Sequence, residues 1–331
     1  MVKQPTVISL FAGGGGSSLG YKKAGYKELL AVDSNPLSCV TIKNNFNFQV
    51  LDKDIRTIST SEILETAKIK VGSLDVLDGS PPCQGFSPAG RRNADDNKNT
   101  LYLEYIRILT EAKPKAFVME NVPGMAQGTH RGVFNEIFQA LQATGYTIRC
   151  KILNAANYQV PQYRKRIFFI GLRKNQVPQF PNPIAPCVTV GEAFKNVKNK
   201  TYYPNDEKNI PVYEQMQWSK GAIETVDTET LKTHIPRMVK NKNYMFNKIV
   251  VKLNPYKPSP TLCHLLINFG TGTLVHPYKN RLITIEEAKR LCTFPDDFKL
   301  TGTFQQQWGI LGNAVMPMQM YHIAETLKKQ L

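Results

Sequence analysis

The chain has 331 residues and a formal net charge of +16, with 42 lysines and arginines against 26 aspartates and glutamates. This length favours one large domain with a smaller one, and the excess of positive charge favours a polyanionic partner such as nucleic acid. The six cysteines include no Cys-x-x-Cys pair, which argues against a zinc site and a disulfide framework, and no apolar run approaches the roughly 18 residues that cross a membrane.

Short apolar runs alternate with helix-like segments between residues 7 and 170. Strands that alternate with helices predict βαβ units and a mostly parallel sheet, the Rossmann-like form of the α/β class. The predicted strands are 7–11, 29–32, 74–77, 116–119 and 167–170, and the predicted helices are 101–112 and 133–144.

The alternation ends at about residue 173, where the sequence becomes rich in proline, asparagine and lysine. Such a change of composition predicts a domain boundary. Regular patterning returns at 284–291, where Thr284 and Glu287 have the spacing of a helix capping box. A last helix is expected at about 318–329.

One stretch in this second part of the chain has charged side chains of positive sign only. No aspartate or glutamate occurs between Glu229 and Glu286. A solvated surface normally mixes both signs, so the stretch suits a polyanion, although a merely soluble basic face is the alternative. Its basic residues are Lys232, Arg237, Lys240, Lys242, Lys248, Lys252, Lys257, Lys279 and Arg281.

A glycine-rich segment at 11–18 follows the first predicted strand and opens a helix. Backbone amides in such a turn can face a polar cofactor. Asp33 ends the second strand, about 20 residues further on, where a carboxylate accepts hydrogen bonds from ribose hydroxyls. The strict Gly-x-Gly-x-x-Gly spacing fails here. The pattern predicts a nucleoside-containing cofactor and leaves a dinucleotide and S-adenosylmethionine both open.

The tripeptide Pro82-Cys83-Gln84 follows the predicted strand 74–77. Prolines fix φ and remove backbone donors, so Cys83 is expected on a rigid loop at the C-terminal end of a strand, where open α/β sheets bind ligands. A lone cysteine is often a small core residue. The stiffness of this loop favours a thiol that performs chemistry.

Glu120 and Asn121 follow the strand 116–119 and should emerge at the same sheet edge as Cys83. A partly desolvated carboxyl group there can carry a proton near neutral pH. Arg164 and Arg166 are two residues apart, so they would project to one face of an extended segment, and guanidinium groups bind phosphates or carbonyls well. A solvated carboxylate and a basic surface turn are the alternatives.

With these motifs, the chain resembles the DNA (cytosine-5) methyltransferases, in particular the bacterial restriction–modification type. The resemblance runs from end to end, with three departures: Asp33 stands where Glu is usual, Ser80 replaces a frequent Gly, and Glu286 occupies a position that is usually basic. The matching segments, in the order of the family, are 11–17, Asp33, 53–55, 82–84, 120–122, 162–166, 281–298 and 312–315.

The resemblance implies the fold of S-adenosylmethionine-dependent methyltransferases. It implies a catalytic, cofactor-binding domain made of 1–172 and 281–331, and a smaller, irregular target-recognition domain at 173–280 that binds DNA. S-adenosylmethionine would be the cofactor, S-adenosylhomocysteine its product, and no metal would take part. The segments 241–247 and 271–274 are hypothesised to be loops that read bases.

The resemblance also implies roles for single residues. Cys83 would add to carbon 6 of a flipped cytosine, Glu120 would face N3 and the exocyclic amine, and Arg164 would bind the O2 carbonyl, with Arg166 also in the catalytic set. The segment 84–92 would be a loop that closes the site. The cofactor would contact Phe11, Gly13, Gly15, Asp33, Asp54, Pro82, Leu101, Asn313 and Val315.

We expect a monomer that acts on double-stranded DNA in the cytoplasm, associated with the nucleoid and with no membrane partner. Its expected role is protection of host DNA beside a cognate restriction endonuclease, to which it need not bind. An RNA (tRNA) cytosine-5 methyltransferase on the same scaffold and a catalytically inactive DNA-binding relative are the alternatives.

Overall fold

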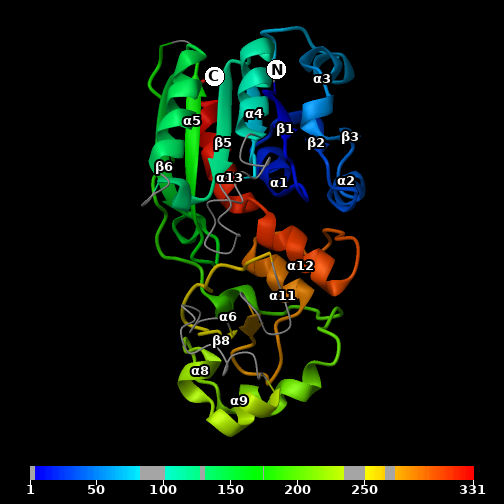
Figure 1. The fold of residues 1–331 in the computed structure, drawn as a ribbon, viewed down its shortest axis with the longest axis vertical. Helices are drawn as coiled ribbons and strands as arrows, with labels where there is room; N and C mark the ends of the chain where they lie inside the picture. Colours follow the sequence, from blue (N-terminus) through cyan, green and yellow to red (C-terminus); the bar gives the residue numbers. More distant parts are fainter. Residues whose placement is uncertain (1–3, 83–100, 127–130, 174, 235–249, 265–272) are drawn as a thin grey trace. The chain divides into compact units, whose positions relative to one another are not determined.

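The computed structural model describes residues 4–82, 101–126, 131–173, 175–234, 250–264 and 273–331 (Figure 1). Contacts divide the chain into two compact units. Unit 1 is Met1–Tyr158, Lys165–Pro183 and Val315–Leu331, and unit 2 is Gln159–Arg164 and Ile184–Ala314. Cys83, the expected closing loop 84–92 and the segment 241–247 lie outside the described residues.

Unit 1 is built on a seven-stranded sheet with the order β3-β2-β1-β4-β5-β7-β6. The neighbours from β3 to β5 are parallel, and β7 is antiparallel to both β5 and β6. The predicted Rossmann-like, mostly parallel sheet is confirmed. The strands are β1 (Thr6–Leu10), β2 (Lys27–Asp33), β3 (Gln49–Asp52), β4 (Val76–Gly79), β5 (Ala116–Asn121), β6 (Thr147–Asn154) and β7 (Lys165–Leu172).

Helices cover both faces of this sheet (Figure 1). Alternate strand residues point to opposite faces, so Ile8 joins one core with α3, α4 and α5, while Val7 joins the other with α1 and α13. The helices of unit 1 are α1 (Gly16–Lys23), α2 (Pro36–Lys43), α3 (Thr60–Thr66), α4 (Leu101–Ala112), α5 (Arg131–Ala143) and α13 (Pro317–Lys328), with 3-10 turns at Ile55–Thr57, Pro123–Ala126 and Ala155–Tyr158.

The close packing of α1 on α13 depends on Gly20. A Cβ atom at this position would lie 2.6 Å from the Cβ atom of Met320 and 2.8 Å from the carbonyl oxygen of Pro317. These distances are shorter than any van der Waals contact, and one of the two atoms belongs to the backbone. The two helices can therefore approach this closely only with glycine at position 20.

We expect Gly20→Ala to lower the free energy of unfolding by about 2 kcal/mol, because overpacking a tight core costs about 1–3 kcal/mol. Gly132→Ala is the matched control, since Gly132 is also helical and a Cβ atom there meets nothing within 4 Å among the described residues. That change should stabilise by up to about 1 kcal/mol. Urea denaturation compares the two, and equal effects would contradict the packing argument.

Unit 2 contains a small parallel sheet of β8 (Val250–Lys252) and β9 (Thr273–Val275) together with several helices. The predicted capping box of Thr284 and Glu287 is present at the start of α11. The helices of unit 2 are α6 (Val190–Ala193), α7 (Ile210–Gln215), α8 (Ala222–Thr225), α9 (Thr228–His234), α11 (Ile285–Leu291) and α12 (Phe304–Asn313), with a 3-10 turn at Asp206–Asn209.

Two expectations about single elements differ from the structure. The fourth strand is Val76–Gly79, two residues later than expected, so Asp78 lies inside it. Thr273 and Leu274 are buried in β9, which argues against base reading by the described half of 271–274. By contacts alone, Val315–Leu331 is the part of 281–331 that packs in unit 1, and the expected division into a catalytic and a target-recognition domain stays a prediction.

Among the residues that the structure describes, no helix has both the length and the apolar character to span a membrane. Over the same ranges, no group of three or more His, Cys, Asp or Glu side chains is placed to hold a metal ion.

Candidate active site

The glycine-rich segment forms a tight turn between β1 and α1. Phe11, Gly13 and Gly15 have positive φ angles of 53°, 53° and 84°, a conformation in which glycine carries no steric penalty. At position 15 glycine is needed twice over, because a Cβ atom would also lie 2.8 Å from a ring carbon of Phe46. The turn therefore has a backbone conformation that favours glycine at positions 13 and 15.

Asp33 joins this turn to the end of β2. Its Oδ2 accepts a hydrogen bond from the backbone N–H of Gly13 at 2.8 Å, and its Oδ1 accepts one from the N–H of Asn35, also at 2.8 Å. Burial raises the pKa of the Asp33 carboxyl group, against these two hydrogen bonds. The structure therefore brings together the glycine turn and the acidic residue, the two features that predicted a nucleoside site.

Asp54 follows β3 beside this strand end, since the N–H of Lys53 donates to the carbonyl oxygen of Asp33 at 3.1 Å. Its carboxylate accepts from the backbone N–H of Arg56 at 3.0 Å and pairs with the Arg56 guanidinium group. These contacts lower the pKa of Asp54 to about 2. Asp54 is thus an ionised acceptor that already has a partner.

The other expected cofactor residues are spread over both units. Leu101 begins α4 and packs at the edge of the main core of unit 1, and Pro82 is the half-buried last residue before the undescribed segment. Val315 is buried in unit 1, and Asn313 is an exposed residue of unit 2 at the end of α12.

Glu120 and Arg166 form an ion pair at the ends of β5 and β7. The Nε atom of Arg166 lies 2.9 Å from Oε1 of Glu120, and the two side chains are 17% and 10% exposed. Next to Glu120, the side-chain amide of Asn121 donates to the carbonyl oxygen of Pro81 at 3.1 Å. This bond ties the end of β5 to the segment that leads to Cys83.

Arg164 has different partners. Its guanidinium group donates to the carbonyl oxygens of Gly312 at 2.9 Å and Leu262 at 3.3 Å, all within unit 2, and the residue is 2% exposed. We expected Arg164 and Arg166 to project to one face, but the strand begins only at Lys165 and the two guanidinium groups engage different partners. The structure brings Arg166 to Glu120.

Gln162, two residues before Arg164, also forms its hydrogen bonds within unit 2. Its side-chain amide donates to the carbonyl oxygen of Leu291 at 3.3 Å, and its Oε1 accepts from the N–H of Leu262 at 3.1 Å. The residue is fully buried in unit 2. The first half of the Gln-x-Arg-x-Arg motif is therefore part of the packing of unit 2.

Two acids with enclosed carboxyl groups, Asp78 and Glu28, were missed by the sequence reasoning. Asp78, in β4, accepts from the Tyr21 hydroxyl at 3.3 Å, and burial raises its pKa to about 7, with the charge of Glu120 acting in the same direction. Glu28, in β2, accepts from the Ser18 hydroxyl at 3.0 Å, and burial raises its pKa to about 8. A polar residue within each apolar strand was the available signal.

These acids predict a pH dependence of stability. The folded chain holds protons on Glu28 up to about pH 8, whereas the unfolded chain releases them near pH 4.5. The free energy of unfolding should therefore fall as pH rises through this window, by up to about 1.4 kcal/mol per pH unit for each such group. Glu28→Gln should flatten this dependence in urea denaturation.

The exposed Glu65→Gln provides the matched control for this measurement, because it makes the same chemical replacement at the surface of unit 1. It should leave the dependence on pH as in the wild-type protein. A Glu28→Gln variant whose stability falls with pH as steeply as that of the control would contradict burial of a protonated Glu28.

Comparisons with known proteins match nearly the whole chain. The family described as C-5 cytosine-specific DNA methylase matches residues 5–329. The Type II methyltransferase M1.HphI of Haemophilus parahaemolyticus is 35% identical over 98% of this chain and 87% of its own length. The Type II methyltransferase M.XorII of Xanthomonas oryzae is 31% identical over 99% of this chain and 85% of its own.

Solved structures agree with this match. A prophage-encoded protein of E. coli, described as a DNA modification methyltransferase, superposes with a TM-score of 0.74 at 26% identity and covers 98% of this chain and 99% of that one. The Entamoeba histolytica methyltransferase EhMeth has a TM-score of 0.71 at 19% identity, over 99% of each chain, which supports the fold alone.

Proposed function

The chain belongs to the family of C-5 cytosine-specific DNA methylases, and we propose that it methylates a cytosine flipped out of a specific sequence of double-stranded DNA through a covalent bond to Cys83. As a member it is a DNA (cytosine-5) methyltransferase, and the comparisons do not favour the RNA-modifying or inactive alternatives. The observation that carries the proposed site is the Glu120–Arg166 pair, beside the segment that leads to Cys83.

The residues of unit 1 fit S-adenosylmethionine. The position of a Gly13 Cβ atom has no other described atom within 4 Å, so there is room beside the turn, and the Asp33 carboxylate lies there as an acceptor for ribose hydroxyls. We assign the contacts to Phe11, Gly13, Gly15 and Asp33. When bound, the cofactor supplies the methyl group and leaves as S-adenosylhomocysteine.

The remaining expected contacts are proposals of the same kind. Asp54 would bind the adenine amine, which requires its carboxylate to share or release the Arg56 guanidinium group. Pro82 and Leu101 would line the pocket, and Asn313 and Val315 would lie near the methionine end.

Cys83 would supply the nucleophile. Carbon 5 of cytosine is a poor nucleophile, and addition of the Cys83 thiolate to carbon 6 turns carbon 5 into the reactive end of an enamine. Once carbon 5 carries the methyl group, loss of its proton allows the sulfur–carbon bond to break, and the electron pair returns to Cys83. The target base must leave the duplex first, at a cost of a few kcal/mol.

Glu120 and Arg166 would hold the ring during this addition. A protonated Glu120 can donate to N3, where electron density grows as the thiolate adds, and its other oxygen can accept from the exocyclic amine. Because Arg166 is the guanidinium group next to Glu120, we assign the O2 carbonyl to Arg166 in place of Arg164. Arg164 would instead position the chain within unit 2.

In the cell, the enzyme would protect host DNA beside a cognate restriction endonuclease. The two relatives named above are Type II methyltransferases, which supports this role. We propose that it acts as a monomer in the cytoplasm, associated with the nucleoid through its DNA substrate, that no metal takes part, and that unit 2 contributes target recognition.

Expression in a bacterial host without DNA methylation tests this function. Bisulfite sequencing of the host DNA should find 5-methylcytosine at one short sequence, which also identifies the target base. Incubation of the purified enzyme with labelled S-adenosylmethionine should label plasmid DNA and not tRNA. Label in tRNA alone would contradict a DNA substrate.

A further inference from the structure

Three aromatic side chains of unit 2 contact one another at the surface. The ring of Trp218 lies 5.9 Å from that of Tyr256 and 5.8 Å from that of Tyr278, both edge to face. The three residues are 40%, 72% and 64% exposed, and no other large hydrophobic side chain in the described ranges is as exposed as the two tyrosines. Exposed aromatic groups gathered in this way indicate a contact surface.

Two of the rings stand on turns that hydrogen bonds hold in place. The indole N–H of Trp218 donates to the carbonyl oxygen of Pro277 at 2.8 Å, and the backbone of Trp218 bridges to that of Lys252. The N–H of Tyr256 donates to the side chain of Asn254 at 2.9 Å. The ring of Trp218 and the backbone that carries Tyr256 are therefore held in place, which leaves less conformational freedom to lose on binding and favours affinity.

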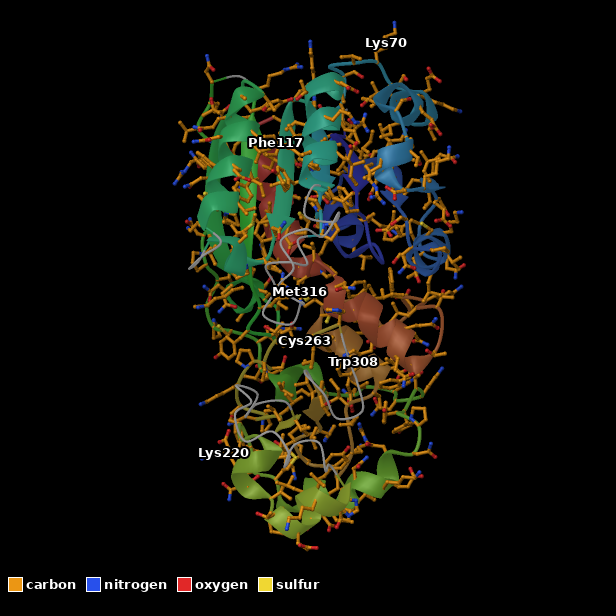
Figure 2. All side chains as sticks on the ribbon, in the orientation of Figure 1. Lys70, Phe117, Lys220, Cys263, Trp308 and Met316 are labelled. Atoms are coloured by element: carbon orange, nitrogen blue, oxygen red, sulfur yellow. The ribbon has the colours of Figure 1, made fainter. Side chains whose placement is uncertain are left out.

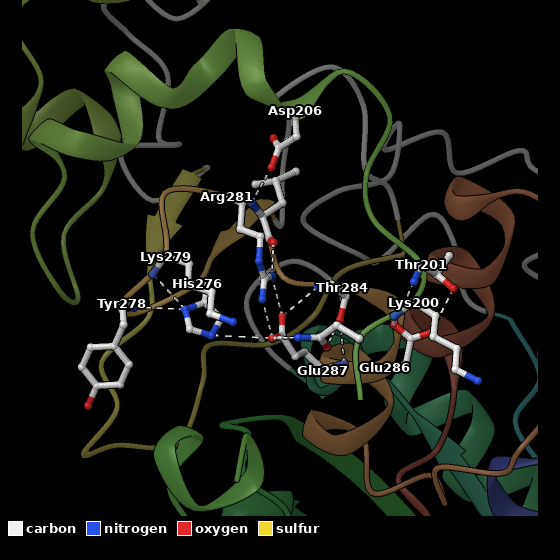
Figure 3. A network of polar contacts seen from close by, with 12 residues as sticks. Lys200, Thr201, Asp206, His276, Tyr278, Lys279, Arg281, Thr284, Glu286 and Glu287 are labelled. Atoms are coloured by element: carbon white, nitrogen blue, oxygen red, sulfur yellow. Dashed lines mark hydrogen bonds and ion pairs between the residues drawn. The ribbon is translucent and has the colours of Figure 1, made fainter. Parts of the chain in front are cut away.

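The turn that carries Tyr278 is anchored on a buried polar network (Figure 3). The Nδ1 atom of His276 accepts from the N–H of Tyr278 at 3.1 Å and from that of Lys279 at 3.0 Å. Burial lowers the pKa of His276 to about 4, so the ring is neutral at pH 7 and Nδ1 is free of a proton. Its Nε2 atom lies 3.6 Å from Glu287, which also pairs with Arg281.

Each ring has an exposed lysine one or two residues further along the chain. Lys220 follows Trp218, Lys257 follows Tyr256 and Lys279 follows Tyr278, and all three lysines are exposed. The side chain of Lys220 is labelled in Figure 2. We name these six residues the aromatic–lysine surface. Tyr256, Lys257, Tyr278 and Lys279 belong to the stretch between Glu229 and Glu286 that has no acidic residue.

We propose that the aromatic–lysine surface binds the sugar–phosphate backbone of duplex DNA, in contacts that do not depend on base sequence. Ammonium groups neutralise phosphates, and phenol hydroxyls donate to phosphate oxygens. Reading of base edges relies instead on paired donors and acceptors such as Arg, Asn or Gln side chains present. The inference rests on the proposed function, because it concerns the same substrate.

Two variants of the full chain test the surface. One replaces Lys220, Lys257 and Lys279 with alanine, and the other replaces Tyr256 and Tyr278 with alanine. Because all five side chains are exposed, both variants should fold, as thermal denaturation would check. The measurement is fluorescence anisotropy with a labelled duplex of about 30 base pairs and mixed sequence, between about 50 and 200 mM salt.

The lysine variant should bind this duplex about tenfold more weakly or worse, and the slope of log affinity against log salt should become shallower by about 2.7, or about 0.9 for each lysine. The tyrosine variant should lose affinity about fivefold with little change of slope, since it removes no charge. The control replaces the exposed Lys195, Lys198 and Lys208 of unit 2, an equal change of net charge, and should keep nearly the wild-type slope.

If both the lysine variant and the tyrosine variant bind DNA with wild-type affinity and wild-type salt dependence, the proposal is wrong. The surface would then bind another partner, such as a protein. Equal losses in the control would overturn it too, because net charge alone would then explain binding. Methylation of plasmid DNA by the wild-type enzyme tests the proposed function separately. A wild-type enzyme that binds DNA through this surface without methylating it would contradict only that function.

Discussion

Replacement of Cys83 by alanine is expected to lower the rate of DNA methylation at least about 10³-fold, because removal of a covalent nucleophile leaves only the contribution of binding and orientation. Without the sulfur, carbon 5 of the ring does not become nucleophilic. Binding of S-adenosylmethionine and of duplex DNA should persist. Single-turnover methylation of plasmid DNA, with binding measured separately, gives both quantities.

Cys187→Ala is the matched control for this experiment. Cys187 is a free, partly exposed cysteine, so its removal tests whether any thiol change disturbs the enzyme, and full activity is expected. A duplex that contains 5-fluorocytosine should trap the wild-type protein and the control as a covalent adduct, but not Cys83→Ala. If Cys83→Ala keeps more than about a tenth of the wild-type rate, the covalent mechanism is wrong.

Loss of either partner in the Glu120–Arg166 pair should produce the second largest effect. Glu120→Gln keeps the size of the side chain but cannot move a proton, and general acid catalysis contributes about 10²–10⁴-fold. We expect kcat to fall by at least about 10²-fold with an unchanged affinity for S-adenosylmethionine. Single-turnover rates on plasmid DNA measure this loss.

Replacement of each of the two arginines of the motif in turn shows which one contacts the cytosine ring. Arg166→Met should reduce kcat about as strongly as Glu120→Gln, because both lie at the proposed cytosine position. Arg164→Met should instead lower stability, because two carbonyl oxygens in buried surroundings lose their donor, at about 1–3 kcal/mol each. A reversed pattern, with a stable but inactive Arg164 variant, would return the O2 carbonyl to Arg164.

The position of Glu286 illustrates what a departure from the family pattern can mean. Its carboxylate accepts from the N–H groups of Lys200 and Thr201, both at 3.1 Å, and from the Thr201 hydroxyl at 2.9 Å. These contacts lower the pKa of Glu286 against burial. The acidic residue therefore has its own partners inside unit 2, as Figure 3 shows.

The sequence by itself determined the features that depend on neighbours along the chain. The strand–helix alternation predicted the mostly parallel sheet, and the spacing of Thr284 and Glu287 predicted a capping box that the structure contains. The glycine run predicted a turn between the first strand and a helix, and the structure has that turn, with positive φ angles at Gly13 and Gly15. Each of these follows from local backbone preference or periodicity, which a few residues suffice to express.

Only the tertiary structure decided which distant groups meet. Arg166 reaches Glu120 because β7 runs antiparallel to β5 in one register, and Arg164 meets Gly312 across 148 residues of chain. A shift of one residue in strand pairing reverses which face each side chain occupies. The residues of the Gln-x-Arg-x-Arg motif therefore could not reveal, from their spacing alone, which arginine accompanies the carboxyl group and which is buried in unit 2.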